Sequence, residues 1–167
     1  MHDPQSRLNI MVSPEQEKLL IMACYTLQHQ LKLHSISVLN FATTYCQMKQ
    51  TGQRGHEMTY QTYNFFYSRK MDHLGPSGLV VEHVIANKGK RNQNGNVTTH
   101  AIAPHANPLF DTSAHTGLLF IYRHCVMNER LPDFDNYKEC FSCPQYRSAK
   151  TCTPIKMSTL YTLYKKM

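Results

Sequence analysis

A basic turn, NKGKRNQNGN at residues 87–96, constrains the fold of this chain more than any other segment. It lies between residues 79–85 and 97–102, two runs rich in β-branched side chains with polar interruptions, which is typical of partly buried strands. Two glycines and four asparagines in the turn tolerate the backbone angles of a chain reversal, and the Asn94-Gly95 pair favours a tight turn. The sequence therefore predicts an antiparallel β-hairpin.

The tip of this hairpin carries a charge that the turn itself does not neutralise. Lys88, Lys90 and Arg91 have no acidic neighbour in the turn, so their charges face either solvent or an anion. Asn92 and Gln93 supply amide donors and acceptors that suit base edges or sugar oxygens. A solvated hairpin tip and a phosphate-binding tip are both consistent with this pattern, because charged runs commonly lie on solvated faces.

The charge of the whole chain favours an anionic partner. Lys and Arg number 18 against 11 Asp and Glu, which gives a formal charge of +7, and ten histidines can add to it near phosphates. An anionic membrane surface would also attract such a chain. However, no apolar run approaches the ~20 residues needed to span a bilayer, and we find no signal peptide, so we expect a soluble protein without a membrane partner.

Length and composition predict one domain. A chain of 167 residues with 41% hydrophobic residues can bury a core of its own. We expect a loose leader at 1–12, a single domain over 13–167, and loop-rich segments at 49–58 and 126–150. The six cysteines lack the dense, regular spacing of a small secreted scaffold, which favours a reducing compartment.

The first helix is predicted from its capping box. Ser13 can cap the helix, Pro14 suits its first position, and Gln16 completes the box, so we expect a helix from there to about residue 30. Leu19, Ala23 and Leu27 recur at four-residue spacing. This spacing predicts that their face of the helix is buried.

Three further helices complete a mostly helical prediction. We expect a helix from Val38 onward within 35–48, and another over 112–127, where Asp111 or a following hydroxyl can act as the cap. Ser158 can cap a last helix that contains Leu160, Tyr161, Leu163 and Tyr164. The predicted fold is therefore mainly α with one small antiparallel β-hairpin.

Four short motifs, which follow one another in a fixed order, make this sequence resemble a known family. Gly-Lys-x-Asn-Gln-x-Gly is followed by His-x-x-Pro, by Gly-x-Leu-x-x-Tyr-x-x-Arg and by Glu-x-x-Pro-Asp-Phe. The order resembles a fungal family that comprises the DNA-binding subunit of the centromere-binding kinetochore complex and relatives derived from Crypton transposons. The matching residues are Gly89, Lys90, Asn92, Gln93 and Gly95; His105 and Pro108; Gly117, Leu118 or Leu119, Tyr122 and Arg123; and Glu129, Pro132, Asp133 and Phe134.

The resemblance implies a fold like the catalytic domain of tyrosine recombinases, used in the nucleus to bind double-stranded DNA without strand cleavage. Lys90, or else Lys88, is then the counterpart of a recombinase lysine that enters the DNA from a hairpin. His105 and Arg123 join the expected DNA-binding set through their motifs. Arg123 has an alternative role, since it can instead tie its helix to a carboxylate such as Glu129 or Asp133. Family members often act as homodimers, although no stretch of this sequence marks a self-complementary surface.

Departures from the family pattern argue against catalysis. Strand cleavage by recombinases needs two arginines on the scissile phosphate, a proton-transfer set and a tyrosine nucleophile. Where relatives place arginines, this chain has Leu27-Gln28-His29-Gln30 and Pro104. A clamp of two guanidiniums is therefore not visible, and we assign no catalytic residue.

The first alternative is an active strand transferase whose remaining catalytic residues lie beyond Met167. Tyr161 or Tyr164 would be its nucleophile, but no His-x-x-Arg box or His-Leu-Gly-His element precedes them after Arg123. The DHLG at 72–75 imitates the second element in the wrong order. Both tyrosines are better explained as packing residues of an amphipathic helix.

The second alternative is a zinc-stabilised interaction module. Cys140 and Cys143 have the spacing of a zinc-binding pair, and Cys152 follows nine residues later. Cys125, His124 or His115 could supply a fourth ligand. With only one such pair present, we expect ordinary reduced cysteines and no cofactor.

Overall fold

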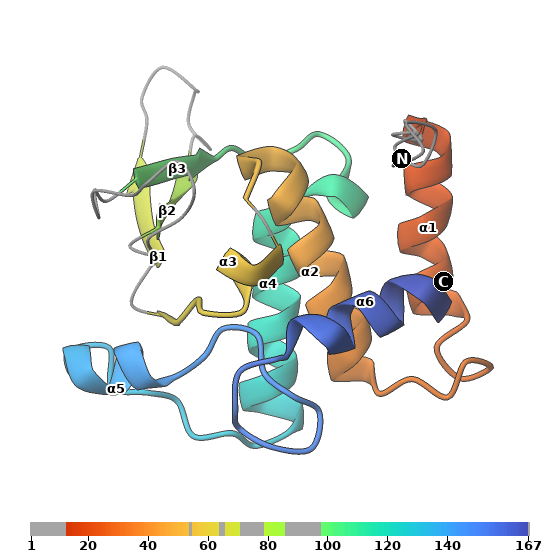
Figure 1. Ribbon diagram of the computed structural model, residues 1–167. Helices are drawn as coiled ribbons and strands as arrows, with labels where there is room; N and C mark the ends of the chain where they lie inside the picture. Colours follow the sequence, from red (N-terminus) through yellow and green to blue (C-terminus); the bar gives the residue numbers. More distant parts are fainter. Residues whose placement is uncertain (1–12, 54, 64–65, 71–78, 86–97, 167) are drawn as a thin grey trace, which may run out of the picture.

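The computed structural model describes residues 13–53, 55–63, 66–70, 79–85 and 98–166. The chain is mainly helical there, as predicted, with a small sheet at one side (Figure 1). The helices are α1 Pro14–Thr26, α2 Ser35–Thr51, α3 Gly55–Met58, α4 Thr112–Ile121, α5 Tyr137–Ser142 and α6 Met157–Lys166, with a 3₁₀ turn η4 Pro108–Phe110 and a π-helical turn η5 Tyr122–Val126; the strands are β1 Phe66–Lys70, β2 Leu79–Ile85 and β3 Thr98–Ile102.

Helix α2 is the centre of the helical body and begins three residues before the predicted Val38. One of its faces packs with α4, α6 and the 146–155 segment, through Ile36 and Leu39, and another packs with α1 and α6, through Val38 and Phe41. Its buried threonines donate their hydroxyl hydrogens to carbonyls one turn back, which satisfies polar groups inside the core.

Helix α1 starts as predicted but buries a different face. Ser13 Oγ accepts from Gln16 N at 3.3 Å, and Gln16 Oε1 accepts from Ser13 N at 2.8 Å, so the capping box is confirmed. The helix ends at Thr26, earlier than predicted. Its inward residues are Glu17, Ile21 and Cys24, whereas Leu19 is 65% exposed and Leu27 37% exposed. The predicted buried stripe of Leu19, Ala23 and Leu27 is therefore wrong.

The three strands form an antiparallel sheet in the order β1-β2-β3. In the pairing of β2 with β3, Val81 lies opposite Ile102 and Ile85 lies opposite Thr98. Ile102, at the end of β3, is 1% exposed and anchors this strand against the helical body. The predicted strand positions at 79–85 and 97–102 thus correspond to β2 and β3.

The predicted helix at 112–127 is present, with a change of form in its last turn. Asp111 Oδ1 accepts from Ser113 N at 2.8 Å and from Ala114 N at 3.2 Å, so Asp111 is the cap. After Ile121 the α-helix continues as the π-helical turn η5, in which Met127 N donates to Tyr122 O at 3.0 Å.

Two segments predicted as loops contain helices. Within 49–58, α2 continues to Thr51 and α3 follows, so that prediction is wrong. The segment 126–150 is irregular as predicted except for α5. The predicted final helix is α6, which begins at Met157 and buries Leu160 and Leu163. Among the described residues, no helix has the length and apolar character needed to cross a membrane.

Candidate nucleic-acid interface

The two antiparallel strands β2 and β3 flank the basic segment in the sequence. Their last pair is Ile85 with Thr98, and residues 86–97 between them lie outside the described part of the chain. Five of the expected DNA-binding residues belong to that segment, namely Lys88, Lys90, Arg91, Asn92 and Gln93. The structure does not place these five residues, so the phosphate-binding tip stays a prediction.

His105 lies on the surface, in the loop between β3 and η4. Its backbone N–H donates to Asp111 Oδ2 at 3.2 Å, and its Nδ1 is 3.0 Å from the N–H of Asn107. The edge contact between its ring and Phe110 further fixes the ring. His105 Nδ1 also lies 3.1 Å from Asn107 O, so Nδ1 accepts from or donates to Asn107 according to the tautomer of the ring. In either case the ring is anchored at this surface position.

Arg123 does not belong to a surface interface. Its residue is 2% exposed, and Nη1 donates to the carbonyls of Pro144 at 2.7 Å and Gln145 at 3.0 Å. Its Nε donates to Glu129 Oε2 at 2.5 Å. These protein groups occupy the donors that a phosphate would need, so the expected DNA contact of Arg123 is wrong. The alternative role, an ion pair with Glu129, is the one that the structure shows.

A second buried arginine shares the same carboxylate. Arg147 is 4% exposed and forms an ion pair through Nε with Glu129 Oε1, while its Nη1 donates to Ser148 O at 2.8 Å. We call Arg123, Glu129 and Arg147 the arginine cluster. The Glu129 side chain is 14% exposed, so little water competes for its charge. The cluster joins η5, the turn that follows α4, to the strand-like segment around residues 144–147.

The ring of Tyr63 covers one side of the arginine cluster. The guanidinium carbon of Arg123 lies 5.1 Å from the centre of this ring. The Tyr63 hydroxyl is 3.1 Å from His124 Nε2, and His124 Nδ1 is 3.0 Å from Glu129 O. Burial raises the pKa of Tyr63. Burial alone lowers the pKa of Arg123, but Tyr63 and the Glu129 carboxylate offset this, and the net direction is upward.

The π-helical turn explains how Arg123 reaches this position. Its wider turn rotates the residues after Ile121 relative to an α-helix, and Glu129 N donates to Arg123 O at 3.0 Å. In this turn Arg123 lies in the interior beside its carboxylate.

The cysteines of the zinc alternative each contact a different protein group. Cys140 is buried and its Sγ is 3.4 Å from Asp133 O, whereas Cys143 Sγ is 3.7 Å from Arg123 Nη2. Cys152 is exposed. Burial raises the pKa of Cys143, which works against the thiolate that zinc requires. In the described part of the chain, no group of three or more His, Cys, Asp or Glu side chains is arranged to hold a metal ion.

The other expected zinc ligands and nucleophiles have different surroundings. His115 is buried, with Nδ1 2.7 Å from the Tyr25 hydroxyl and Nε2 2.9 Å from Leu109 O. It therefore links α1 to α4. Tyr161 is 60% exposed, so its predicted packing role is wrong, while Leu160 and Leu163 of the same helix are buried.

Exposed lysines add to the basic character of the described surface. Six of them form no ion pair with another described residue: Lys18, Lys32, Lys138, Lys150, Lys156 and Lys165. By contrast, Arg130 pairs with Glu139 on the surface at 3.2 Å. The uncompensated lysines are distributed over α1, the 27–34 segment, α5, the 143–156 segment and α6.

Sequence reasoning missed the buried amide cluster beside the arginine cluster. Gln47 Nε2 donates to Gln53 at 3.2 Å and to Gln61 at 3.1 Å, and its Oε1 accepts from the Tyr146 hydroxyl. Glutamines carry no signal of burial in a sequence, because their partners come from distant segments. This cluster ties α2 to both of the irregular segments that hold Tyr63 and Arg147.

We compared the chain with protein-family models, curated proteins and solved structures, and none of them matched.

Proposed function

We propose that this protein is a duplex-DNA-binding domain with a tyrosine-recombinase-like fold. It contacts phosphates through a β-hairpin made of β2, β3 and the basic segment between them, and it does not cleave the strand. The antiparallel pairing of β2 with β3 carries this proposal, because it brings together the two ends of a segment with three cations and no carboxylate.

His105 supports a footprint wider than the hairpin alone. The basic segment precedes Thr98 in the sequence, and His105 follows Ile102, so β3 separates the two along the chain. A duplex that contacts both would meet the protein at more than one phosphate.

The arginine cluster supports binding without cleavage. A recombinase needs two guanidiniums directed at the scissile phosphate. In the described residues the two buried arginines, Arg123 and Arg147, are both directed at Glu129 instead. Where relatives place arginines, this chain has an exposed His29 and an exposed Pro104. The charge stabilisation that cleavage needs is therefore not assembled from these residues.

Two measurements test the proposal. Fluorescence anisotropy with a labelled 20-base-pair duplex should show saturable binding that weakens steeply with salt, and His105→Ala should reduce the affinity a few-fold. His34→Ala, which changes an exposed histidine before α2 whose side chain makes no capping hydrogen bond, serves as the matched control and should have no effect. A nicked suicide duplex should yield no covalent adduct. An adduct at Tyr161 or Tyr164 would replace this proposal with an active strand transferase, and an absence of duplex binding would remove it.

A further inference from the structure

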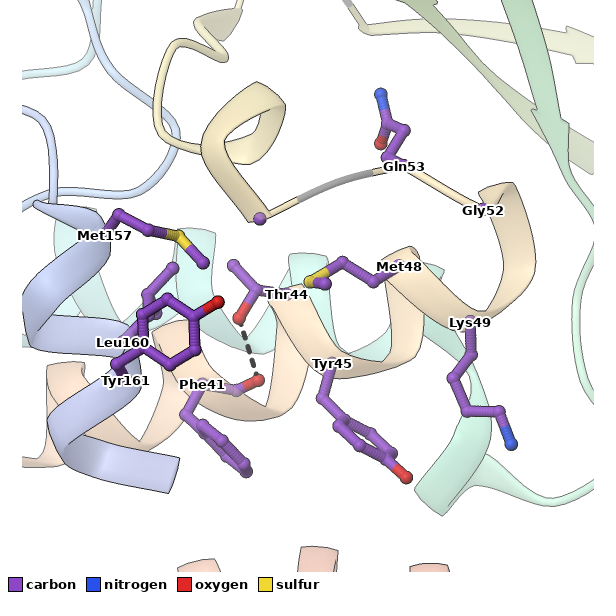
Figure 2. Close-up of a pocket in the computed structure, with 11 residues that line it drawn as sticks. Phe41, Thr44, Tyr45, Met48, Lys49, Gly52, Gln53, Met157, Leu160 and Tyr161 are labelled. Atoms are coloured by element: carbon purple, nitrogen blue, oxygen red, sulfur yellow. Dashed lines mark hydrogen bonds between the residues drawn. The ribbon is translucent and has the colours of Figure 1, made fainter. Parts of the chain in front are cut away.

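A pocket of about 790 Å³ lies on the side of α2 that faces the start of α6 and the segment after Thr51 (Figure 2). Its walls are mainly apolar and come from α2 and α6: Phe41, Tyr45, Met48, Met157, Leu160 and Tyr161. Ligand pockets of 300–1,000 Å³ with such walls hold small molecules of mostly apolar character. Two of the wall residues are methionines, whose flexible thioethers adapt to the shape of a bound chain.

Gly55 lines the pocket beside Met157. A Cβ added at this position would lie 2.2 Å from Met157 Cε, so only glycine leaves room for the Met157 side chain as it stands. Met157 reaches across from α6 toward Met48 on α2, and the two side chains bound the same part of the pocket (Figure 2). The apolar part of the pocket is thus built from three separate segments of the chain.

Lys49 is the one formally charged residue among the described residues that line the pocket. Its side chain is 52% exposed, and its ammonium donates to Glu17 Oε1 of α1. An ammonium has three N–H donors, so a second carboxylate can share it. The pocket therefore combines long apolar walls with one cationic group at its edge.

The polar groups of the pocket favour a tail over a peptide. Thr44 Oγ1 already donates to Asn40 O at 2.8 Å, and Gln53 Oε1 already accepts from Gln47 and Gln61. A buried peptide backbone needs a partner for each N–H and C=O group, and the other polar side chains of the lining, Tyr45, Lys49 and Tyr161, are too few to supply them. An unbranched hydrocarbon chain has no such requirement.

We propose that this pocket binds a monomeric amphiphile with an unbranched apolar tail and a single carboxylate head, such as a medium-chain fatty acid. The tail lies against Phe41, Met48, Met157 and Leu160, and the carboxylate pairs with Lys49 beside Glu17. This inference is independent of the proposed DNA binding and uses a different face of the fold.

The absence of tryptophan from the sequence provides a clean reporter. In the variant Tyr161→Trp, the only indole of the chain stands at the rim of the pocket, where residue 161 is 60% exposed. Titration with dodecanoate, below its micelle concentration, should shift the emission to the blue and saturate at one ligand per protein. Dodecanol should bind about tenfold more weakly, and dodecyltrimethylammonium more weakly still.

Two substitutions with opposite expected effects test the head-group contact. Lys49→Met should weaken dodecanoate binding about tenfold and leave dodecanol binding unchanged. Glu17→Gln removes the competing carboxylate and should strengthen dodecanoate binding. Lys156→Met changes an exposed lysine that does not line the pocket and should leave both ligands unaffected. Circular dichroism and the melting temperature show whether each variant is folded.

Several results would overturn the inference. Equal affinity for the three head groups would contradict the proposed pairing of the carboxylate with Lys49. Equal effects of Lys49→Met on dodecanoate and dodecanol binding would contradict it as well. A response to lipid vesicles but not to monomeric dodecanoate would point to a membrane surface instead. Saturable binding only after deletion of residues 1–12, or only in a dilute monomer, would show that the chain itself or a second copy fills the pocket.

Discussion

The Nε of Arg123 donates to Glu129 Oε2 at 2.5 Å. The other oxygen of this carboxylate, Oε1, forms an ion pair with Arg147 Nε. One buried negative charge thus holds two guanidiniums that come from η5 and from the 144–147 segment. Interior ion pairs of this kind add little stability compared with well-packed apolar residues. Removing one partner, however, leaves the other charges buried and unpaired, which destabilises the fold. The arginine cluster is therefore a structural joint, and the predictions for it are about stability.

Glu129→Gln should lower the free energy of unfolding by about 3 kcal/mol, because it leaves two buried guanidiniums without their counter-charge. Urea unfolding followed by circular dichroism measures the effect. Glu139→Gln is the matched control, since it breaks the surface pair with Arg130, whose side chain is 82% exposed. Surface pairs contribute about 0–1 kcal/mol, so equal losses in the two variants would contradict a buried joint.

Arg123→Lys should also destabilise the fold, by about 2 kcal/mol. A lysine ammonium cannot reach Glu129 and the carbonyls of Pro144 and Gln145 together in the planar arrangement of a guanidinium. The folded variant should nevertheless bind duplex DNA as tightly as the wild type. A large loss of affinity in a fully folded Arg123→Lys protein would return this residue to the DNA-binding set.

Local signals in the sequence predicted the beginnings of elements well. Ser13 with Gln16, and Asp111 before Ser113, cap helices through contacts within three residues, so a short window contains the whole interaction. The positions of β2 and β3 were likewise marked by their β-branched composition. The candidate interface is based almost entirely on the sequence, because five of its seven expected DNA-binding residues lie in 86–97, outside the described residues.

Interior residues were predicted poorly where their partners are distant. Glu17 of α1 faces inward and pairs with Lys49 of α2, whereas Leu19 of the same helix is exposed. Arg123 is buried because Glu129 and the carbonyls of residues 144–145 meet it through a π-helical turn. The spacing of apolar residues predicts neither arrangement, because the partners of Glu17 and Arg123 lie 32 and 6 residues away along the chain.

Two glycines should respond to alanine in opposite directions. Gly52 ends α2 with φ of 67°, a left-handed conformation, and an added Cβ would meet no atom within 4 Å. Gly52→Ala should therefore cost about 1 kcal/mol through backbone strain alone. Gly117 lies inside α4, also with no atom within 4 Å of an added Cβ, and Gly117→Ala should stabilise by about 0.5–1 kcal/mol. Thermal unfolding of both variants checks the signs; a loss for Gly117→Ala would indicate that this position faces a partner.

The cysteines should divide into two classes of reactivity. Burial raises the pKa of both Cys24 and Cys46 to about 12, so at pH 8 only about one thiol in ten thousand is ionised at each. Cys125 and Cys152 are exposed. Brief treatment of the native protein with iodoacetamide at pH 8, followed by mass spectrometry, should label these two and spare Cys24 and Cys46. If all six cysteines were labelled in the native protein, without urea, the helical core would open readily.

The dependence of duplex affinity on salt tests the central claim most directly. The variant Lys88→Ala/Lys90→Ala/Arg91→Ala should bind more weakly than the wild type, and its slope of log K against log salt should be shallower by about 2 to 3, since each lost phosphate contact contributes about 0.9. A control with the same charge change, Lys18→Gln/Lys156→Gln/Lys165→Gln, alters exposed lysines of the helical body and should keep the wild-type slope. An unchanged slope in the first variant, or an equal reduction in both, would contradict DNA binding through the segment between β2 and β3.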